Sequence, residues 1–197
     1  MCARFVILDD NEIAEINQIL KDVNMKFDGT GIVAKTGEVF STDNVPAVML
    51  QNEKPSLTII KWDGEGVIIN AKSETATDKK MFSAAVSTRR CIIPSNGFYE
   101  WSQAMDKSKT KYRFNSLDSP MLYLAGLHTN FSNQESDSLL TERFVILTTT
   151  ANSDVNDVHT RMPVILHKDE IVRWLRDYDY AKSIISRNTL KLIREAV

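Results

Sequence analysis

Apolar and polar positions change their period several times along the chain, and the changes predict a mixture of strands and helices. Residues 3–8 are mostly apolar and predict a strand. From Ile13 to Val23 apolar residues recur at helical spacing, which predicts an amphipathic helix with Asp10 as its N-cap. Later apolar runs predict strands at residues 45–50, 57–62, 67–69, 90–93, 97–101, 111–114, 121–127, 143–149 and 163–166. Four later segments predict helices, at residues 78–86, 151–158, 168–176 and 180–195.

The predicted strands are unevenly spaced and mixed with helices, without a regular β-α-β alternation. This pattern predicts an α+β fold, with a curved and mostly antiparallel sheet as a barrel-like core surrounded by helices. Polar segments predict loops with short strand pieces at residues 28–44, a turn at 63–66, and loops at 102–110 and 132–141. No repeat, linker or low-complexity segment divides the 197 residues, so the chain predicts one domain over residues 1–197.

Composition and charge narrow the class of protein. The chain is 43% hydrophobic and 25% charged, which is typical of a soluble globular protein, and its net charge is −2. No global field would therefore draw it to nucleic acid or to an anionic membrane, and any anion site must be a local patch. No apolar run approaches 18 residues and no signal-peptide pattern follows Met1. We therefore expect a cytoplasmic protein that does not contact membranes.

The cysteine and histidine content gives no sign of a disulfide framework or a metal centre. Only two cysteines occur, and no Cys or His spacing is typical of a zinc site. We therefore expect no metal and no cofactor. Cys91 lies in an apolar run and is predicted to be a small core residue.

Cys2 directly follows the initiator methionine. A methionine before so small a residue is normally removed, which would leave Cys2 with a free α-amine and a thiol on adjacent carbons. Their reference pKa values, about 7.7–8.0 and about 8.5, leave a reactive fraction of each near neutral pH. Against an aldehyde, the amine can form a Schiff base and the thiol can then close a thiazolidine ring. A start codon that merely precedes a cysteine is the plainer interpretation, and position alone does not exclude it.

Three further polar residues lie beside short predicted elements. Asn70 follows an apolar strand, where a carboxamide can organise a site by donating and accepting hydrogen bonds, or can simply cap a turn. Glu100 lies between Tyr99 and Trp101. It is either partly desolvated, with a raised pKa useful for proton transfer, or a solvent-facing strand residue. His159 lies at a helix-to-strand junction and can carry protons near pH 7 or be a satisfied structural histidine.

Basic residues concentrate in residues 72–113, which hold nine lysines and arginines against four acids. Four aromatic residues are interleaved with them, namely Phe98, Tyr99, Trp101 and Tyr112. Positive charge with flat side chains is what a groove for single-stranded nucleic acid needs. A run of charge is also typical of a solvated face, so this signal is weak by itself.

Taken in order along the chain, these segments resemble the motifs of the SOS-response-associated peptidase family of abasic-site processing proteins. The similar segments are residues 1–5 (MCARF), 70–75 (NAKSET), 90–101 (RCIIPSNGFYEW) and 159–163 (HTRMP). The resemblance implies a one-domain α+β fold whose N-terminal cysteine links covalently to abasic sites in single-stranded DNA. No metal takes part in that family.

Carried over residue by residue, the resemblance assigns the nucleophile to Cys2 and the lining of the same pocket to Asn70, Glu100 and His159. The DNA contacts that it implies fall on Arg4, Trp62, Lys72, Trp101 and Arg161. The chain departs from the family pattern in three places. Ala3 replaces a glycine, a lysine stands where an arginine usually forms a phosphate fork, and the run around Trp62 is shortened.

The resulting hypothesis is an abasic-site sensor of bacterial or phage origin that acts as a monomer in the DNA damage response. It would shield the abasic site through a thiazolidine cross-link and show weak abasic-site lyase activity as a side reaction. Two alternatives stay open. One is a cysteine peptidase, with Cys2 as nucleophile and His159 as base, whose only proteolysis could be the removal of Met1. The other is a module that binds single-stranded DNA without a covalent bond.

Overall fold

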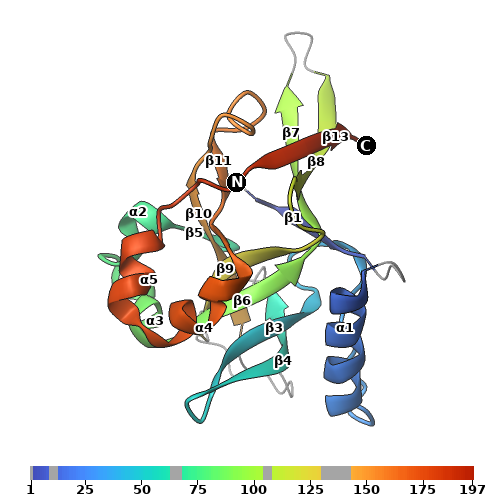
Figure 1. Ribbon diagram of the computed structural model, residues 1–197, viewed down its shortest axis with the longest axis vertical. Coiled ribbons are helices and arrows are strands. Elements are labelled where there is room, and N and C mark those ends of the chain that lie inside the picture. Colours follow the sequence, from blue (N-terminus) through green and yellow to red (C-terminus); the bar gives the residue numbers. More distant parts are fainter. Residues whose placement is uncertain (1, 9–12, 63–67, 104–107, 130–142) are drawn as a thin grey trace.

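The computed structural model describes residues 2–8, 13–62, 68–103, 108–129 and 143–197. Within these ranges it has two β-sheets and several short helices (Figure 1). The α+β class predicted from the pattern of strands and helices is confirmed.

The first sheet is antiparallel and has the strand order β13-β8-β7-β1-β2. Its strands are β1 (Arg4–Ile7), β2 (Gly37–Val39), β7 (Gly97–Gln103), β8 (Lys109–Ser116) and β13 (Leu192–Ala196). β1 is an interior strand of this sheet and pairs with β7 on one side and with the edge strand β2 on the other. The N-terminal segment is therefore anchored by hydrogen bonds on both sides.

The second sheet curls into a ring. Strand β10 pairs with β4 on one side and with β9 on the other, which closes the path β10-β4-β3-β6-β9 on itself. The ring strands are β3 (Asn44–Gln51), β4 (Lys54–Trp62), β6 (Arg90–Ser95), β9 (Leu122–Thr129) and β10 (Arg143–Thr150). Three short strands extend it, namely β5 (Asn70–Lys72), β11 (Arg161–Pro163) and β12 (Ile165–Leu166). Closure satisfies backbone groups that an open edge would expose, so the barrel-like core is confirmed.

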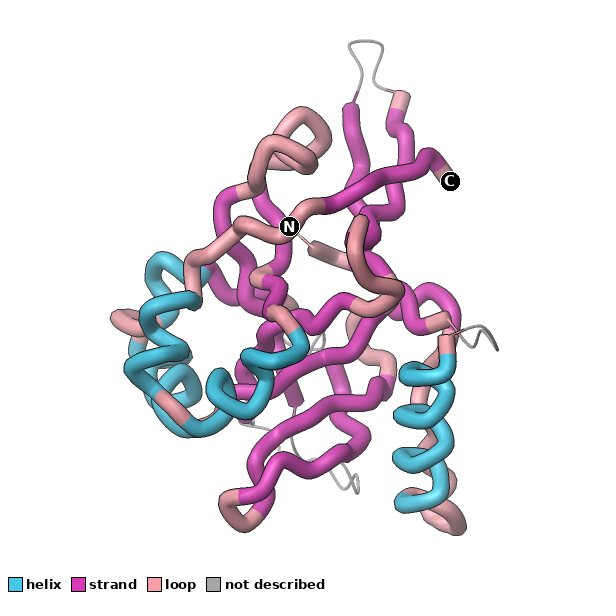
Figure 2. The backbone as a smooth tube through the Cα atoms, viewed as in Figure 1, coloured by secondary structure: helices cyan, strands magenta, loops and turns pink. Residues whose placement is uncertain are grey.

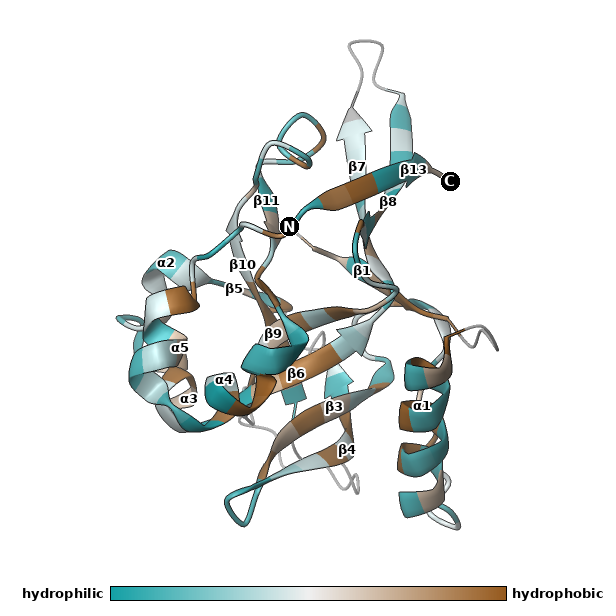
Figure 3. Ribbon diagram, viewed as in Figure 1, coloured by the Kyte–Doolittle hydropathy of each residue, from teal (hydrophilic) through white to brown (hydrophobic). Residues whose placement is uncertain are grey.

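The helices lie in two groups (Figure 2). Helix α1 (Ala14–Lys26) packs by itself against β3 and β4, and its buried residues Ile16, Leu20 and Val23 form the apolar face that Figure 3 shows in brown. The other helices gather on the opposite side of the barrel. They are α2 (Ser73–Ala76), α3 (Lys80–Thr88), η1 (Lys168–Glu170), α4 (Ile171–Arg176) and α5 (Tyr178–Ile184).

Aromatic packing joins the two sheets. Trp62 of the ring is fully buried, with its ring centroid 5.1 Å from that of Phe5 in the first sheet and 6.0 Å from that of Phe144 in β10. Its indole N–H donates to the carbonyl of Ile69 at 3.0 Å. Truncating such a residue to alanine typically costs about 3–5 kcal/mol, so this cluster helps to set the spacing between the N-terminal segment and the barrel.

Three predicted elements differ from the structure. Residues 151–158 form turns rather than a helix, because the side chain of Asn152 accepts from the Asp154 N–H at 3.1 Å and diverts the backbone. The predicted helix at 180–195 ends with α5 at Ile184. The rest of that segment leads into β13, where pairing with the edge of β8 overrides helical periodicity.

The third difference is a shift of a strand. Ile68 and Ile69 precede β5 rather than forming the strand, so Asn70 lies inside the strand and not after it. Asp10 and residues 63–66 and 132–141 lie outside the described residues, so the predicted cap, turn and loop stay predictions. The other predicted strands and helices are present, with shifts of a few residues at their ends.

Candidate active site

Cys2 lies where the two sheets meet. It precedes β1, and the register of β1 with β7 pairs Arg4 with Tyr99, which places Glu100 beside the start of the chain. The Cys2 side chain is fully buried, and its thiol lies 3.6 Å from the carbonyl of Arg4, to which it donates. Burial raises the pKa of this thiol far above its ordinary value, and the charge of Glu100 raises it further. A buried thiol with this raised pKa is protonated near neutral pH, whereas the partly ionised thiol expected of Cys2 as a free N-terminus stays a prediction.

Asn70 ties the barrel to the N-terminal segment. Its side-chain N–H donates to the carbonyl of Cys2 at 2.8 Å, although the two residues are 68 positions apart in the chain. β5 carries Asn70 and is held parallel to β10, with Asn70 opposite Ile146. Helix α2 has Lys72 at its N-cap position, so Asn70 is not a helix cap. Its side-chain oxygen is buried and accepts no hydrogen bond from any described residue, so it can accept one from a bound group.

Glu100 is a buried carboxyl group. It lies in β7 with only 3% of its surface exposed, which excludes the alternative of a solvent-facing strand residue. Burial raises its pKa to about 7. A carboxyl group with this pKa can both give and take a proton near neutral pH, which is the property that general acid–base chemistry requires.

His159 is half-buried at the entrance to β11. Its Nδ1 accepts the backbone N–H of Arg161 at 3.0 Å, so the neutral ring carries its proton on Nε2. Burial lowers the pKa of the imidazole. The neutral ring therefore prevails at physiological pH, with Nε2–H as its donor. The described contacts of His159 include Arg161, and those of Cys2 include Asn70 and Glu100.

The two arginines expected to contact DNA are both held by carboxylates. Arg161 binds Glu74 with both terminal nitrogens, at 2.6 and 2.9 Å, and this hydrogen-bonded pair lowers the pKa of Glu74. Arg4 lies 3.0 Å from Glu38, which also binds Lys111 at 2.7 Å. Binding of DNA phosphates at these arginines would have to compete with Glu74 and Glu38.

Aromatic rings lie beside the two ion pairs that Glu38 forms with Arg4 and Lys111. The Arg4 guanidinium lies 5.0 Å from the ring centroid of Trp101 and 4.5 Å from that of Phe40. The Lys111 ammonium lies 4.0 Å from the ring of Tyr99. Trp101 is partly exposed, and the predicted contact of this residue with DNA stays a prediction.

Trp62 behaves differently. It has no exposed surface, because Phe5 and Phe144 cover its faces. A side chain in this position cannot stack on a nucleotide, so the prediction that Trp62 contacts DNA is wrong. Its motif position reflects core packing instead.

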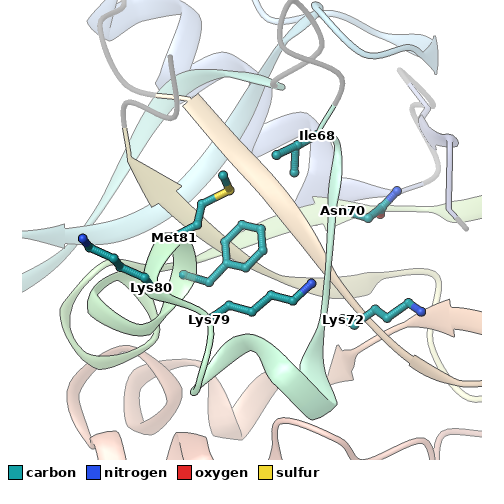
Figure 4. Close-up of a pocket in the computed structure, with 7 residues that line it drawn as sticks. Ile68, Asn70, Lys72, Lys79, Lys80 and Met81 are labelled. Carbon is teal, nitrogen blue, oxygen red and sulfur yellow. The ribbon is translucent and has the colours of Figure 1, made fainter. Parts of the chain in front are cut away.

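A pocket opens beside Asn70 and was not predicted as a site. It has a volume of about 500 Å³ (Figure 4). Its lining residues are Ile68, Asn70, Lys72, Lys79, Lys80, Met81 and Phe82. Two of its lining residues, Asn70 and Lys72, were predicted as site residues, and the excess of basic residues in 72–113 also pointed toward it. The pocket itself was not predictable, because residues distant in the chain meet here only after folding.

Within the described ranges, no cluster of three or more His, Cys, Asp or Glu side chains could hold a metal ion. The described helices are also too short or too polar to cross a membrane.

Known proteins match this chain along almost its whole length. A family model described as SOS response associated peptidase (SRAP) matches residues 1–195. The abasic site processing protein YoqW of Bacillus subtilis (strain 168) is 29% identical over 203 residues, which cover 94% of this chain and 86% of that protein. YoqW of Bacillus phage SPbeta matches to the same extent. The abasic site processing protein HMCES of Xenopus tropicalis is 28% identical over 142 residues, covering 63% of this chain and 41% of that protein.

Solved structures share the fold. An X-ray structure of a protein from Bacteroides thetaiotaomicron matches with a TM-score of 0.79 at 20% identity, covering 100% of this chain and 92% of that chain. The X-ray structure of a phage-related protein from Bordetella bronchiseptica matches with a TM-score of 0.71 at 21% identity, covering 100% of this chain and 94% of that chain. At these identities the comparison concerns the fold alone.

Proposed function

Because this chain belongs to the SOS response associated peptidase family, we propose that it processes abasic sites in single-stranded DNA by linking them covalently to Cys2. The names of its relatives support abasic-site processing as the general role. The observation that carries the covalent proposal is the junction at Cys2. There the Asn70 side chain donates a hydrogen bond to the Cys2 carbonyl. Glu100, with a pKa of about 7, is close enough for its charge to raise the pKa of the Cys2 thiol.

The reaction begins after Met1 is removed and the α-amine of Cys2 is free. An abasic deoxyribose opens to its aldehyde, and the amine adds to C1′ to give a carbinolamine. Protonation of the hydroxyl group by Glu100 releases one water and leaves an iminium ion, whose nitrogen keeps its hydrogen. The thiol then returns a proton to Glu100 as its sulfur adds to the iminium carbon, which closes the thiazolidine. The net change is the loss of one water.

Each neighbouring group has a role that fits its environment. Glu100 protonates the leaving hydroxyl and then accepts the thiol proton, because its pKa of about 7 allows both transfers. Because the raised pKa keeps the Cys2 thiol protonated, the sulfur needs a nearby base when it attacks, and Glu100 is that base. Asn70 accepts a hydrogen bond from the amine or a sugar hydroxyl through its buried oxygen, and His159 donates from Nε2.

The DNA strand is held by a local patch and not by the overall charge. Arg4, Lys72, Trp101 and Arg161 supply cations and one aromatic face, and we propose that phosphates displace Glu38 and Glu74 from the two arginines. The imine intermediate also permits β-elimination, so slow strand cleavage accompanies cross-linking.

A denaturing gel tests the proposal. Single-stranded DNA carrying one abasic site is mixed with wild-type protein, Cys2→Ala and the control Cys91→Ala, whose sulfur is also fully buried but lies in β6. Wild type and Cys91→Ala should give a slowly migrating covalent species, and Cys2→Ala should not. Mass spectrometry of the purified protein establishes whether Met1 has been removed. Equal yields from wild type and Cys2→Ala would end the proposal.

The cysteine peptidase alternative is less well supported. A peptidase of this kind needs a thiolate activated by histidine, whereas burial raises the pKa of the Cys2 thiol and lowers that of His159. Turnover of an unrelated peptide by purified protein, lost in Cys2→Ala, would reverse this preference.

A further inference from the structure

The loop that carries His159 to β11 is tied together by its own backbone. It spans residues 151–160, between β10 and β11, and the Ala151 N–H donates to the Thr160 carbonyl at 3.0 Å. Inside the loop, the His159 N–H donates to the carbonyl of the fully buried Val155 at 2.9 Å. The position of the imidazole therefore follows the position of the whole loop.

The C-terminal segment, residues 188–196, binds this loop along one edge. The side-chain N–H of Asn152 donates to the Leu190 carbonyl at 2.9 Å, and the Leu192 N–H donates to the carboxylate of Asp154 at 3.0 Å. In an extended chain the backbone groups of every second residue point to the same side. Two loop side chains therefore bind the backbone of the segment where a neighbouring strand would otherwise pair with it.

The other edge of the C-terminal segment pairs with the first sheet. β13 lies along β8, which pairs in turn with β7, so that Tyr112 of β8 lies opposite both Ala196 of β13 and Glu100 of β7. Figure 1 shows the segment in red, running from α5 past β10 and β11 to β13. The segment therefore connects the loop of His159, which belongs to the ring sheet, to the sheet that begins beside Cys2.

We propose that Asn152 and Asp154 are positioning residues for His159, because their bonds to the C-terminal segment hold the loop at a fixed place relative to the first sheet. This inference rests on the proposed function, in which His159 donates from Nε2 to the group bound at Cys2. The donor and the nucleophile come from different sheets, so a link between the sheets sets their separation. A displacement of about 1 Å can slow a reaction about 100-fold.

The side chain of Asn152 permits a substitution that breaks only the link. Its oxygen accepts the Asp154 N–H at 3.1 Å within the loop, whereas its N–H group binds the C-terminal segment. Asn152→Asp keeps the acceptor and loses the donor. Asp154→Leu removes the acceptor for the Leu192 N–H, and Asp154→Asn keeps a side-chain oxygen for it.

The first test measures the rate of cross-linking in single-turnover gels on single-stranded DNA with an abasic site. Asn152→Asp and Asp154→Leu should react about tenfold more slowly or worse, and Asp154→Asn should regain most of the wild-type rate. Circular dichroism checks that each variant is folded at the assay temperature. Fluorescence anisotropy with a tetrahydrofuran oligonucleotide, which has no aldehyde, measures DNA affinity. This affinity should change much less than the rate.

A matched control uses the same substitution in another part of the chain. Asn24 of α1 is half-buried like Asn152, and its side-chain oxygen accepts the Ala34 N–H at 3.2 Å. Asn24→Asp keeps this acceptor and should react like wild type. If Asn152→Asp and Asp154→Leu lose no more than Asn24→Asp, the inference is wrong.

The second test asks whether the effect passes through His159. A residue that acts by positioning His159 has nothing left to position in His159→Ala, so adding Asn152→Asp to that variant should cause no further loss of rate. A residue that only stabilises the fold would cause the same loss in both backgrounds, and that result would overturn the inference. A wild-type rate in His159→Ala would also overturn it.

The third test does not need cross-linking. An NMR titration follows the imidazole of His159, which is assigned by its absence in His159→Ala. Burial lowers the pKa of this imidazole, with the charge of Arg161 acting in the same direction. A loosened loop exposes the ring, so its pKa should rise toward the ordinary value in both Asn152→Asp and Asp154→Leu. The first variant adds a negative charge and the second removes one, so charge cannot raise the pKa in both.

The outcomes separate this inference from the proposed function. A pKa that rises in Asn152→Asp alone would be an effect of charge and, like an unchanged titration in both variants, would overturn the inference. If wild type forms no covalent species but the pKa rises in both variants, the cross-linking proposal fails and the link that positions His159 stands. If wild type and both variants cross-link equally fast, the cross-linking proposal stands and the positioning role fails.

Discussion

Glu100 and Glu170 are the same chemical group in two environments that move its pKa in opposite directions. At Glu100, in β7 beside Cys2, burial dominates and raises the pKa to about 7. At Glu170, at the end of η1, burial acts in the same direction but is outweighed, and the pKa falls to about 2. The first environment favours proton transfer near neutral pH, and the second favours a permanent charge.

The contacts of Glu170 explain the difference. It accepts hydrogen bonds from both terminal nitrogens of Arg187, from the Tyr180 hydroxyl at 2.6 Å and from the His167 backbone N–H at 2.8 Å. These donors stabilise the charged form and tie η1 to α5 and the segment after it. Burial alone therefore does not identify a reactive carboxyl group. What identifies such a group is whether burial, which raises the pKa, outweighs the hydrogen-bond donors that lower it.

The largest predicted effect is chemical and falls on Glu100. Glu100→Gln keeps the size of the side chain but cannot exchange a proton, so the rate of cross-linking should fall about 100-fold or more. Single-turnover gels at pH 7 measure this rate, with Glu170→Gln as the control that keeps the wild-type rate at a temperature where it is folded. A Glu100→Gln rate within about twofold of wild type would remove Glu100 from the mechanism.

The next effect concerns stability and falls on Glu170. Its lowered pKa means that its stabilising contribution is complete above about pH 5, the region above the unfolded-state pKa, and is lost as the pH falls toward 2. Glu170→Gln should therefore lower the free energy of unfolding by about 2–3 kcal/mol at pH 7 and by much less near pH 2. Urea unfolding at the two pH values tests this. A difference that stays constant with pH would mean that charge is not the cause.

The contribution of Glu100 to the free energy of unfolding should change with pH in the opposite direction. Its raised pKa means that the folded state loses stability as the pH rises from about 4.5 to 7, because the unfolded chain ionises more easily. Glu100→Gln should stabilise the protein by about 1–2 kcal/mol at pH 8 and have little effect at pH 4. Destabilisation at pH 8 would show that the carboxylate is better satisfied than its pKa indicates.

The smallest effect concerns the ion pairs that Glu38 forms with Arg4 and Lys111. Ion pairs that solvent still reaches contribute little to stability, and those of Glu38 are only partly buried, so Glu38→Gln should change the unfolding midpoint only slightly. Releasing Arg4 and Lys111 should tighten binding to single-stranded DNA about two- to fivefold at low salt, with a smaller gain at high salt. Asp22→Asn removes one exposed acid from α1 and serves as the control in the same anisotropy titration. An equal gain in the control would assign the effect to net charge alone.

Much of the fold follows from local sequence patterns. Strands of alternating or continuous apolar residues and the amphipathic helix α1 are found where the sequence predicts them, because those patterns match the two faces of each element. The helix predicted at the C-terminus fails at β13, because the edge of β8 supplies pairing partners that no local pattern reveals. Tertiary pairing decides such ambiguous segments.

The sequence predicts which chemical groups belong to the candidate site but not whether they are buried or protonated. Cys2, Asn70 and Glu100 follow from the ordered motifs, yet the motifs do not show that the thiol is buried or that the carboxyl pKa is raised. The motif position of Trp62 gives no sign that its ring is fully covered, and the lysines near Met81 give no sign that they line a pocket with Asn70.

By itself the amino-acid sequence determined the fold class, most strands and the residue types that we propose carry the chemistry, since periodicity and motif order are local properties. Only the tertiary structure decided which groups are buried, which cations are already paired and which residues meet. Solvent exposure and electrostatic interaction depend on neighbours in space, and here those neighbours come from distant parts of the chain, as Asn70 and Cys2 do.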